Sequence, residues 1–253
     1  MKIACLNSGT VRSRAAQTEI EGAYNCVAME DADVIVALGG DGFLLHTIHE
    51  VRPLGKPIFG MNRGTVGFLL NPYAPDDLMT RISGAMALKL APIRVETETL
   101  DGNRVVSLAF NELSVIRYSN QSANLKLSID GRCQLDKYVG DGLIFATPAG
   151  STAYNLAVRG PILPLDSNVL ALTPVSPFRP RRWFGAVVPN TTMLEIEVLD
   201  AGKRPVGVSA DFHEVRDVAS VRARLEPEKS VSVLFDPHQS LEDRIVSEQF
   251  YGA

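Results

Sequence analysis

The stretch GGDG, residues 39 to 42, places a carboxylate inside a glycine-rich turn, directly after the apolar run DVIVAL. Glycines allow backbone N–H groups to approach a phosphate closely, because no side chain blocks it. Asp41 would repel a phosphate, so its carboxylate would have to act on another group. The structural alternative is a plain turn in which Asp41 caps the following helix. The stretch lacks the lysine and spacing of a Walker A loop and the glycine spacing of the dinucleotide fingerprint.

Asn111 and Glu112, in the stretch FNEL, form a second candidate site. An amide both donates and accepts hydrogen bonds, and a carboxylate accepts two hydroxyl protons, so this pair can hold a vicinal diol. The dipeptide is also common in turns and edge strands. On these two residues alone, both interpretations stay open.

The stretch YVGDGLIFATPAGSTAYNLAVRGPILP, residues 138 to 164, is rich in small and hydroxyl side chains. It contains a second Gly-Asp-Gly around Asp141, a strand-like run LIFAT, a turn PAGS and a helix start that Ser151 or Thr152 can cap. Small residues there would admit a flat base, and Tyr154 is available to stack on it. A tight strand-to-helix connection in a packed core is the alternative, but it does not explain this clustering of small and hydroxyl residues.

Several basic side chains have both a binding and a structural interpretation. His46, five residues after Asp41, can approach a phosphate or the nucleotide, or it can be a surface or packing residue. Arg63, in the stretch MNRG, can reach a phosphate or remain a solvated charge. The cluster RPRR at residues 179 to 182 can anchor phosphate or another subunit, or form an exposed basic loop.

The first 90 residues alternate strand and helix patterns, as parallel α/β sheets do. The expected strands are residues 2–8, 33–38 and 56–62, and the expected helices are residues 13–29, 43–51 and 74–90. Ligands of such Rossmann-like sheets bind at the carboxyl edge of the strands, which is where the GGDG turn falls.

From about residue 91 the pattern becomes an alternation of apolar and polar residues, which is typical of antiparallel sheets. The alternating runs are residues 93–100, 104–110, 125–130, 194–199 and 231–235. Turn signals DGN and DG, at 101 to 103 and 130 to 131, indicate hairpins. After Pro237, a Ser240 cap with acidic residues behind it predicts a short helix over residues 240–250.

We therefore expect an α/β domain and a mainly antiparallel β domain. Residues 1–90 form the first, completed by residues 236–253 with a helix that returns to it, and residues 91–235 form the second. The chain has no internal repeat and no low-complexity linker, so we expect a broad interface with a ligand cleft between the domains.

The composition is that of a soluble globular protein, with 45% hydrophobic and 21% charged residues among 253. A formal charge of −4 gives no electrostatic basis for binding nucleic acid or an anionic membrane. Cys5, Cys26 and Cys133 lack the paired spacings of zinc sites and disulfide frameworks, which favours reduced thiols in a cytoplasmic protein. The chain shows neither a signal-peptide pattern nor an apolar run of transmembrane length.

Four motifs together carry a family resemblance. They are GGDG at 39–42, GMNRGTVGFL at 60–69, NE at 111–112 and GDGLIFATPAGSTAYN at 140–155. In this order they make the chain resemble the NAD kinases of the bacterial type, and the resemblance in domain plan runs over the whole chain. GGDG alone also occurs in diacylglycerol kinases, but the ordered set is far more specific. The resemblance implies an ATP-dependent kinase that phosphorylates the 2′-hydroxyl of the adenosine ribose of NAD and makes NADP.

The resemblance also implies roles for individual residues in the cleft. Asp41 would be the catalytic proton acceptor, acting late in a loose transition state that depends more on positioning than on basicity. Asn111 and Glu112 would bind ribose hydroxyls, and Asp141 would contact a polar edge of the dinucleotide. Further NAD contacts would come from Gly42, His46, Ala149, Thr152, Ala153, Tyr154, Asn155 and Ala157. The ATP phosphates would lie against Gly39, Gly40 and Gly42.

The resemblance implies NAD and ATP as small-molecule substrates, with Mg²⁺ or another divalent metal accompanying ATP and no protein ligand assigned to it. Relatives are commonly dimers or tetramers, so a homo-oligomer is expected. Two alternatives stay open: a lipid or sphingoid-base kinase of the GGDG type, and a dinucleotide-binding sensor without turnover. The chain lacks an amphipathic basic segment, which counts against the first, and Asp41 counts against the second.

The chain departs from the family pattern at a few positions. Phe43 stands where the family usually has threonine after GGDG, Ala149 replaces a threonine in the PTGS turn, and Ala157 replaces a serine. Each change removes a hydroxyl near the expected site. Asp211 and His213, in VSADFHEV, stand where relatives often have an Asp-Gly pair, so their assignment is open.

Overall fold

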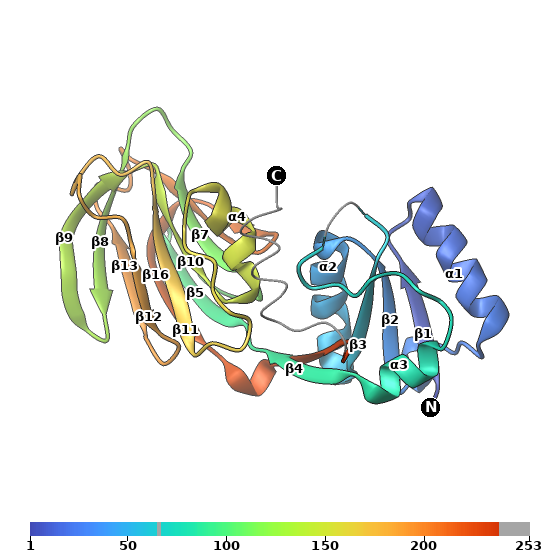
Figure 1. Ribbon diagram of the computed structural model, residues 1–253. Coiled ribbons are helices and arrows are strands. Elements are labelled where there is room, and N and C mark those ends of the chain that lie inside the picture. Colours follow the sequence, from blue (N-terminus) through green and yellow to red (C-terminus); the bar gives the residue numbers. More distant parts are fainter. Residues whose placement is uncertain (65–66, 238–253) are drawn as a thin grey trace. The chain divides into compact units, whose positions relative to one another are not determined.

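The computed structural model describes residues 1–64 and 67–237 (Figure 1). The chain divides into two compact units: an N-terminal unit of Met1–Leu90 with the residues from Glu228 onward, and a β unit of Ala91–Pro227. The second boundary was expected at residue 235. It falls earlier because the strand Val231–Phe235 pairs within the sheet of the N-terminal unit. A search of the described helices finds none that is both long and apolar enough to span a bilayer.

The N-terminal unit is built on a five-stranded sheet with the order β1-β2-β3-β17-β4. Its strands are β1 (Ile3–Asn7), β2 (Val34–Gly39), β3 (Ile58–Asn62), β17 (Val231–Phe235) and β4 (Met86–Leu90). The first four run parallel, and β4 pairs antiparallel with β17. Every residue of β2 is buried, as expected for a strand covered on both faces.

Helices cover both faces of this sheet (Figure 1). They are α1 (Val11–Ala23), α2 (Asp41–Val51) and α3 (Leu78–Gly84), with short 3-10 turns η1 (Met29–Asp31) and η2 (Arg52–Leu54). Ile20 of α1 and Ile82 of α3 share one buried cluster with Val36 of β2. Leu44 of α2 instead lies against Gly60 of β3, on the opposite face. Because β2 ends at Gly39 and α2 begins at Asp41, the carboxyl end of β2 leads directly into α2.

Two expected helices are shorter in the structure. The helix expected over 74–90 ends at Gly84, and Met86–Leu90 forms β4, where Leu88 stands opposite Val233 of β17. The run MALKL suits a helix or a strand, and its pairing partner lies more than a hundred residues away, so local pattern could not decide. The helix expected over 13–29 ends at Ala23. The helix expected over 240–250 lies outside the described residues.

The β unit consists of two six-stranded antiparallel sheets. The first contains β12 (Ala186–Pro189), β11 (Val169–Val175), β10 (Gly142–Ala146), β7 (Glu112–Arg117), β14 (Val206–Ala210) and β15 (His213–Val215). The second contains β6 (Arg104–Ala109), β5 (Ile93–Thr99), β16 (Val218–Leu225), β13 (Leu194–Val198), β8 (Ala123–Ile129) and β9 (Arg132–Gly140). Two short turns of helix complete it, η3 (Ala149–Thr152) and α4 (Tyr154–Ala157), and η4 (Pro227–Lys229) spans the boundary to the N-terminal unit.

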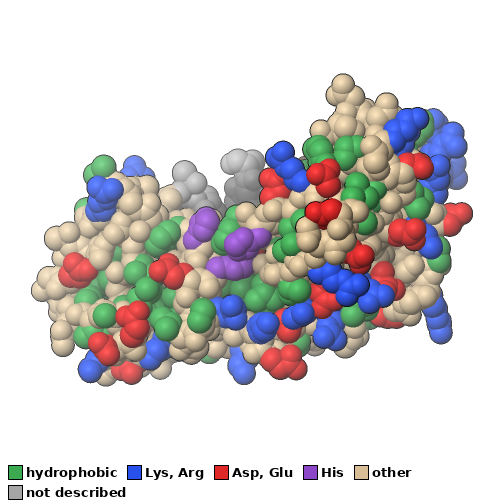
Figure 2. Space-filling view, turned by 180° about the vertical axis from the view of Figure 1, so that it is seen from behind, with side chains coloured by type: hydrophobic (Ala, Val, Ile, Leu, Met, Phe, Trp, Pro, Cys, Tyr) green, Lys and Arg blue, Asp and Glu red, His purple; other side chains and the backbone are tan. Residues whose placement is uncertain are grey.

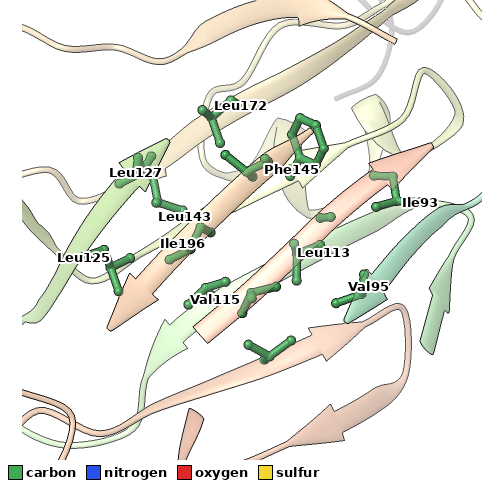
Figure 3. Close-up of a cluster of buried hydrophobic side chains, with 14 of the residues drawn as sticks. Ile93, Val95, Leu113, Val115, Leu125, Leu127, Leu143, Phe145, Leu172 and Ile196 are labelled. Atoms are coloured by element: carbon green, nitrogen blue, oxygen red, sulfur yellow. The ribbon is translucent and has the colours of Figure 1, made fainter. Parts of the chain in front are cut away.

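The two sheets bury a common core of alternating apolar residues (Figure 3). Leu113 and Phe145 come from one sheet, and Val95 and Ile196 come from the other. This is the packing of a β-sandwich. The predicted fold class, a parallel α/β unit followed by a mainly antiparallel β unit, is confirmed.

Charged side chains of both signs lie on the surface of the second sheet. Lys126 pairs with Glu197 at 3.1 Å between Nζ and Oε2, and Arg222 pairs with Glu195 at 3.1 Å between Nε and Oε1. Figure 2 shows Lys and Arg side chains interspersed with Asp and Glu on the visible face. This face of the sheet is therefore solvated, and the buried faces of the sandwich carry its apolar residues.

Candidate active site

The GGDG turn leaves the first turn of α2 open to a ligand. Gly39 ends β2, Gly40 is the N-cap with extended backbone, and Asp41 is the first helical residue. No side chain caps the helix, and a Cβ added at Gly40 or Gly42 would meet nothing within 4 Å. The backbone N–H groups here can therefore receive an anion directly.

Phe43 packs back against the end of β2. A Cβ added at Gly39 would lie 2.6 Å from Cδ1 of Phe43, so the half-buried ring fills the space that a larger residue at 39 would need. The departure from the usual threonine therefore has a packing role. His46, further along α2, has an exposed side chain.

The carboxylate of Asp41 is held by the loop that follows β3. Phe68 donates its backbone N–H to Oδ2 at 2.7 Å, and Leu69 donates to Oδ1 at 3.1 Å. A Cβ at Gly67 would lie 3.1 Å from Oδ1, so the glycine allows this close approach. The backbone N–H of Arg63 donates to the carbonyl of Gly39 at 2.8 Å, which brings this loop against the GGDG turn. These contacts fix the orientation of the Asp41 carboxylate at the start of α2.

Asn111 and Glu112 lie where β6 gives way to β7 in the β unit. Oδ1 of Asn111 and Oε2 of Glu112 are buried and have no hydrogen-bond partner among the residues that the structure describes. Burial, followed by the nearby charge of Asp211, raises the pKa of the Glu112 carboxyl to about 7. Buried polar atoms without partners are costly, so hydroxyl groups of a ligand would satisfy both of these oxygens.

The PAGS turn packs directly on Asn111. Thr147 donates its N–H to the Asn111 carbonyl at 2.9 Å and its hydroxyl to the Phe110 carbonyl at 2.6 Å. A Cβ at Gly150 would overlap the Asn111 carbonyl, so only glycine fits there. The structure thus brings η3 and the start of α4 together with the Asn-Glu pair. Ala149 is buried, Thr152 and Ala153 are half-buried, and Tyr154 and Ala157 are exposed.

Asn155 is directed into the protein. It is fully buried, and its amide donates to the carbonyls of Ser151 at 3.0 Å and Pro161 at 2.9 Å. Its oxygen accepts the hydroxyl of Thr173 at 2.6 Å, and a Cβ at Gly160 would overlap it. We therefore assign Asn155 to holding this loop rather than to a ligand contact.

Asp141 lies at the opposite end of β10 from the other candidates. Gly142 pairs with Ile116, whereas Ala146 pairs with Glu112, so the length of the strand separates Asp141 from the Asn-Glu pair. Such a strand spans about 15–20 Å. The carboxylate of Asp141 forms an ion pair with Arg117. The structure does not bring Asp141 together with Asn111, Glu112 and the PAGS turn.

One part of this region was not identified from the sequence, and the role of a second residue, Asp211, was left open. The backbone N–H groups of Phe68 and Leu69 leave no trace in side-chain chemistry, although GFL belongs to one of the four motifs. Asp211 lies after β14 and accepts hydrogen bonds from the N–H groups of Phe110 and Asn111. Asp211 lies in the two-residue turn between β14 and β15, and its place in VSADFHEV was the available signal.

Comparison with protein families covers most of the chain. Residues 4–87 match the ATP-NAD kinase N-terminal domain, and residues 108–221 match the ATP-NAD kinase C-terminal domain. The chain belongs to the ATP-NAD kinase family. Its two halves carry the two domains of that family in the same order.

Relatives named NAD kinase are similar over almost the whole chain. The protein of Xylella fastidiosa is 49% identical over 249 residues, which cover 98% of this chain and 96% of the relative. That of Rhizorhabdus wittichii is 47% identical over 251 residues, covering 98% of each chain. That of Brucella suis is 49% identical over 245 residues, covering 97% and 95%. The activity of this chain is NAD kinase activity, and the lipid-kinase and sensor alternatives are not favoured.

Solved structures share the fold. Yeast NADH kinase complexed with NADH matches with a TM-score of 0.82 at 20% identity, over 100% of this chain and 87% of that one. An NAD kinase from Archaeoglobus fulgidus in complex with ATP matches with a TM-score of 0.75 at 23% identity, over 100% and 98%. At these identities the matches establish the fold of NAD kinases for this chain.

Proposed function

We propose that this NAD kinase transfers the γ-phosphate of ATP to the 2′-hydroxyl of the adenosine ribose of NAD, with Asp41 accepting the hydroxyl proton. The observation that carries the assignment is the carboxylate of Asp41, fixed by the N–H groups of Phe68 and Leu69 beside the open first turn of α2. A carboxylate and an anion site are thus side by side, as a hydroxyl attacking a phosphate requires.

The ATP phosphates bind at the N-terminus of α2 in this proposal. Gly40 and Gly42 leave its N–H groups accessible, and the helix dipole favours negative charge there. Mg²⁺ or another divalent cation enters as part of the substrate, on the phosphate oxygens, and neutralises their charge. This offsets the repulsion between the phosphates and Asp41.

Asp41 acts mainly through position. Phosphoryl transfer has a loose transition state in which the attacking oxygen has formed little bond, so a strong base is not needed. The two backbone N–H donors fix the orientation of the carboxylate, and the carboxylate accepts the proton of the 2′-hydroxyl. The phosphorus–oxygen bond to ADP breaks as the bond to the 2′-oxygen forms.

Asn111 and Glu112 bind the ribose hydroxyls of NAD in this proposal. Their buried, unpartnered oxygens, Oδ1 and Oε2, are suited to hydroxyl donors. Thr152, Ala153 and Tyr154 supply the adjoining pocket for the base, with the Tyr154 ring available for stacking. The complexes of yeast NADH kinase with NADH and of the archaeal NAD kinase with ATP support dinucleotide and ATP binding in this proposal.

We also propose a cytoplasmic homodimer or homotetramer. The edge strand β12 exposes Val187, and the loop before it exposes Phe184, so this edge offers a pairing surface. Size-exclusion chromatography with light scattering would test the oligomer, because a monomer at all concentrations would contradict it.

The activity is tested by incubating the purified protein with NAD, ATP and Mg²⁺. An NADP-specific dehydrogenase detects the product, and ³¹P NMR assigns the phosphate to the 2′-position. Formation of ADP and 2′-phosphorylated NAD in equal amounts is the expected result. If NAD binds but neither product forms, the chemical proposal fails. Parallel reactions with polyphosphate and with NADH define the donor and the acceptor.

A further inference from the structure

We propose that Asp211 is a positioning residue for NAD binding, because it fixes the backbone from which the Asn111 and Glu112 side chains project. This rests on the proposed role of Asn111 and Glu112 in holding the ribose. Asp211 itself does not touch the substrate in this proposal. It acts through the turn that joins β6 to β7.

The carboxylate of Asp211 accepts three consecutive backbone N–H groups. Phe110 donates to Oδ2 at 2.7 Å, while Asn111 and Glu112 donate to Oδ1 at 2.9 and 3.3 Å. The N–H of Asp211 donates in return to the carbonyl of Glu112 at 3.2 Å. Hydrogen bonds to an ionised acceptor are stronger than hydrogen bonds between neutral groups. A carboxylate that accepts successive backbone N–H groups therefore holds that backbone firmly.

The carbonyl side of the same turn is held by a different residue. Thr147 occupies the carbonyls of Phe110 and Asn111 through its hydroxyl and its N–H. Asp211, directly after β14, and Thr147, directly after β10, thus hold the turn between them. Within the described part of the chain, the side-chain atoms of this turn that lack partners are Oδ1 of Asn111 and Oε2 of Glu112. The backbone is satisfied internally, and the side chains are kept for a ligand.

The conformation of Asp211 suits this task. Its φ of 52° lies in the left-handed region, which aspartate and asparagine tolerate better than most residues. Asparagine at 211 would keep one oxygen for two of the N–H groups but would turn an NH₂ group toward the third. Alanine would leave all three N–H groups without this acceptor. The two substitutions therefore give graded losses.

Asp130 provides a matched control. It also has a left-handed φ, of 50°, and accepts the N–H of Met193 at 2.9 Å, while its own N–H donates to the Met193 carbonyl at 2.9 Å. It sits in the turn between β8 and β9, on the other sheet of the sandwich. Asp130→Asn therefore tests the same substitution at an aspartate of similar backbone conformation that accepts one backbone N–H away from the Asn-Glu pair.

The test compares steady-state kinetics of Asp211→Ala, Asp211→Asn and Asp130→Asn. We expect the KM for NAD to rise about tenfold or more in Asp211→Ala and a few-fold in Asp211→Asn, with the KM for ATP within about twofold of wild type. Asp130→Asn should leave both values unchanged. Direct titration of NAD in the absence of ATP should show the same order of affinities.

A pH profile adds a readout that a purely structural role would not move. Asp211 contributes to the raised pKa of Glu112, so Asp211→Asn should shift the midpoint of the pH dependence of KM for NAD to lower pH. Asp130→Asn should not shift it. If Asp211→Ala does not fold, Asp211→Asn decides.

The proposal is overturned if folded Asp211→Asn keeps the wild-type KM and pH midpoint, or if the KM for NAD and ATP rise equally. Failure of the proposed function would show instead as absence of NADP formation by the wild type, and the NAD titration would still test Asp211.

Discussion

The chain contains two Gly-Asp-Gly turns, and they have different structural roles. In the first, Asp41 begins α2 after a parallel strand, and its neighbours Gly40 and Gly42 face open space. In the second, Asp141 joins β9 to β10, which belong to the two different antiparallel sheets of the β unit. A Cβ at Gly140 would overlap the hydroxyl of Tyr138, and one at Gly142 would overlap the carbonyl of Val115.

The difference shows that the elements around a motif decide what its residues do. A helix N-terminus after a parallel strand leaves unpaired N–H groups at the sheet edge, so its glycines serve ligand access. Within an antiparallel sheet the N–H groups are already paired, so glycines there serve close packing. The aspartates follow the same division: Asp41 is aimed by two N–H groups, whereas Asp141 forms an ion pair with Arg117.

The largest expected effect separates the two aspartates in catalysis. Asp41→Asn should lower kcat by about 10²- to 10⁴-fold, because an amide cannot accept the proton. Asp141→Asn removes a partly exposed ion pair, and we expect less than about tenfold. Coupled NADP assays on folded variants measure both. Wild-type turnover in Asp41→Asn would rule out Asp41 as the base. Equal losses of kcat in the two variants would contradict the difference in role between the two aspartates.

Substitution of a glycine should affect the stability of the protein differently in the two turns. Gly142→Ala forces a methyl group against a backbone oxygen, so we expect a loss of roughly 2–3 kcal/mol in the free energy of unfolding. Gly42→Ala has room and lies in a helix, so stability should be unchanged or slightly higher, while activity falls as phosphate access narrows. Urea unfolding with parallel assays checks this. Comparable losses of stability in Gly142→Ala and Gly42→Ala would contradict the different roles assigned to the two sets of glycines.

Gly39 is the crowded glycine of the first turn, and its substitution tests whether Phe43 requires glycine at this position. Gly39→Ala places its Cβ 2.6 Å from the Phe43 ring, and we expect a loss of about 1–2 kcal/mol as the ring shifts. The loss should be smaller in a Phe43→Thr background, which gives a favourable coupling energy in a double-mutant cycle. Additive losses would show that Phe43 is not what requires glycine at 39.

Glu112, at one end of β10, should make the stability of the protein depend on pH. Glu112 has a pKa raised to about 7 from 4.5, so its carboxyl favours the folded state most below its unfolded pKa. This stability, on the order of 1–2 kcal/mol, is lost as pH rises through 7. Glu112→Gln should flatten the change in unfolding free energy between pH 5 and 8, which urea unfolding at several pH values measures. A flat wild-type profile would contradict the raised pKa.

Much of the fold followed from local patterns. Buried β-branched runs with intervening helical periods predict a parallel sheet, and alternating runs with DG turns predict an antiparallel one. Pairing of Met86–Leu90 with Val231–Phe235 was not predictable in this way, since either segment fits more than one sheet and the partner is distant in the chain. The positions of Asn111, Glu112 and Asp41 as candidates followed from their chemistry and motifs.

The sequence by itself determined the fold class, the family and the residue types available for the reaction, because hydrophobic period and ordered motifs are local properties. Tertiary structure decided which residues keep their polar atoms for a ligand. It turned Asn155 inward, moved Asp141 to the far end of β10, and brought Asp211 to the Asn-Glu turn. The physical reason is that the hydrogen-bond partners of these groups come from distant segments of the chain. Only the folded chain therefore determines which polar groups are paired within the protein and which remain available to a substrate.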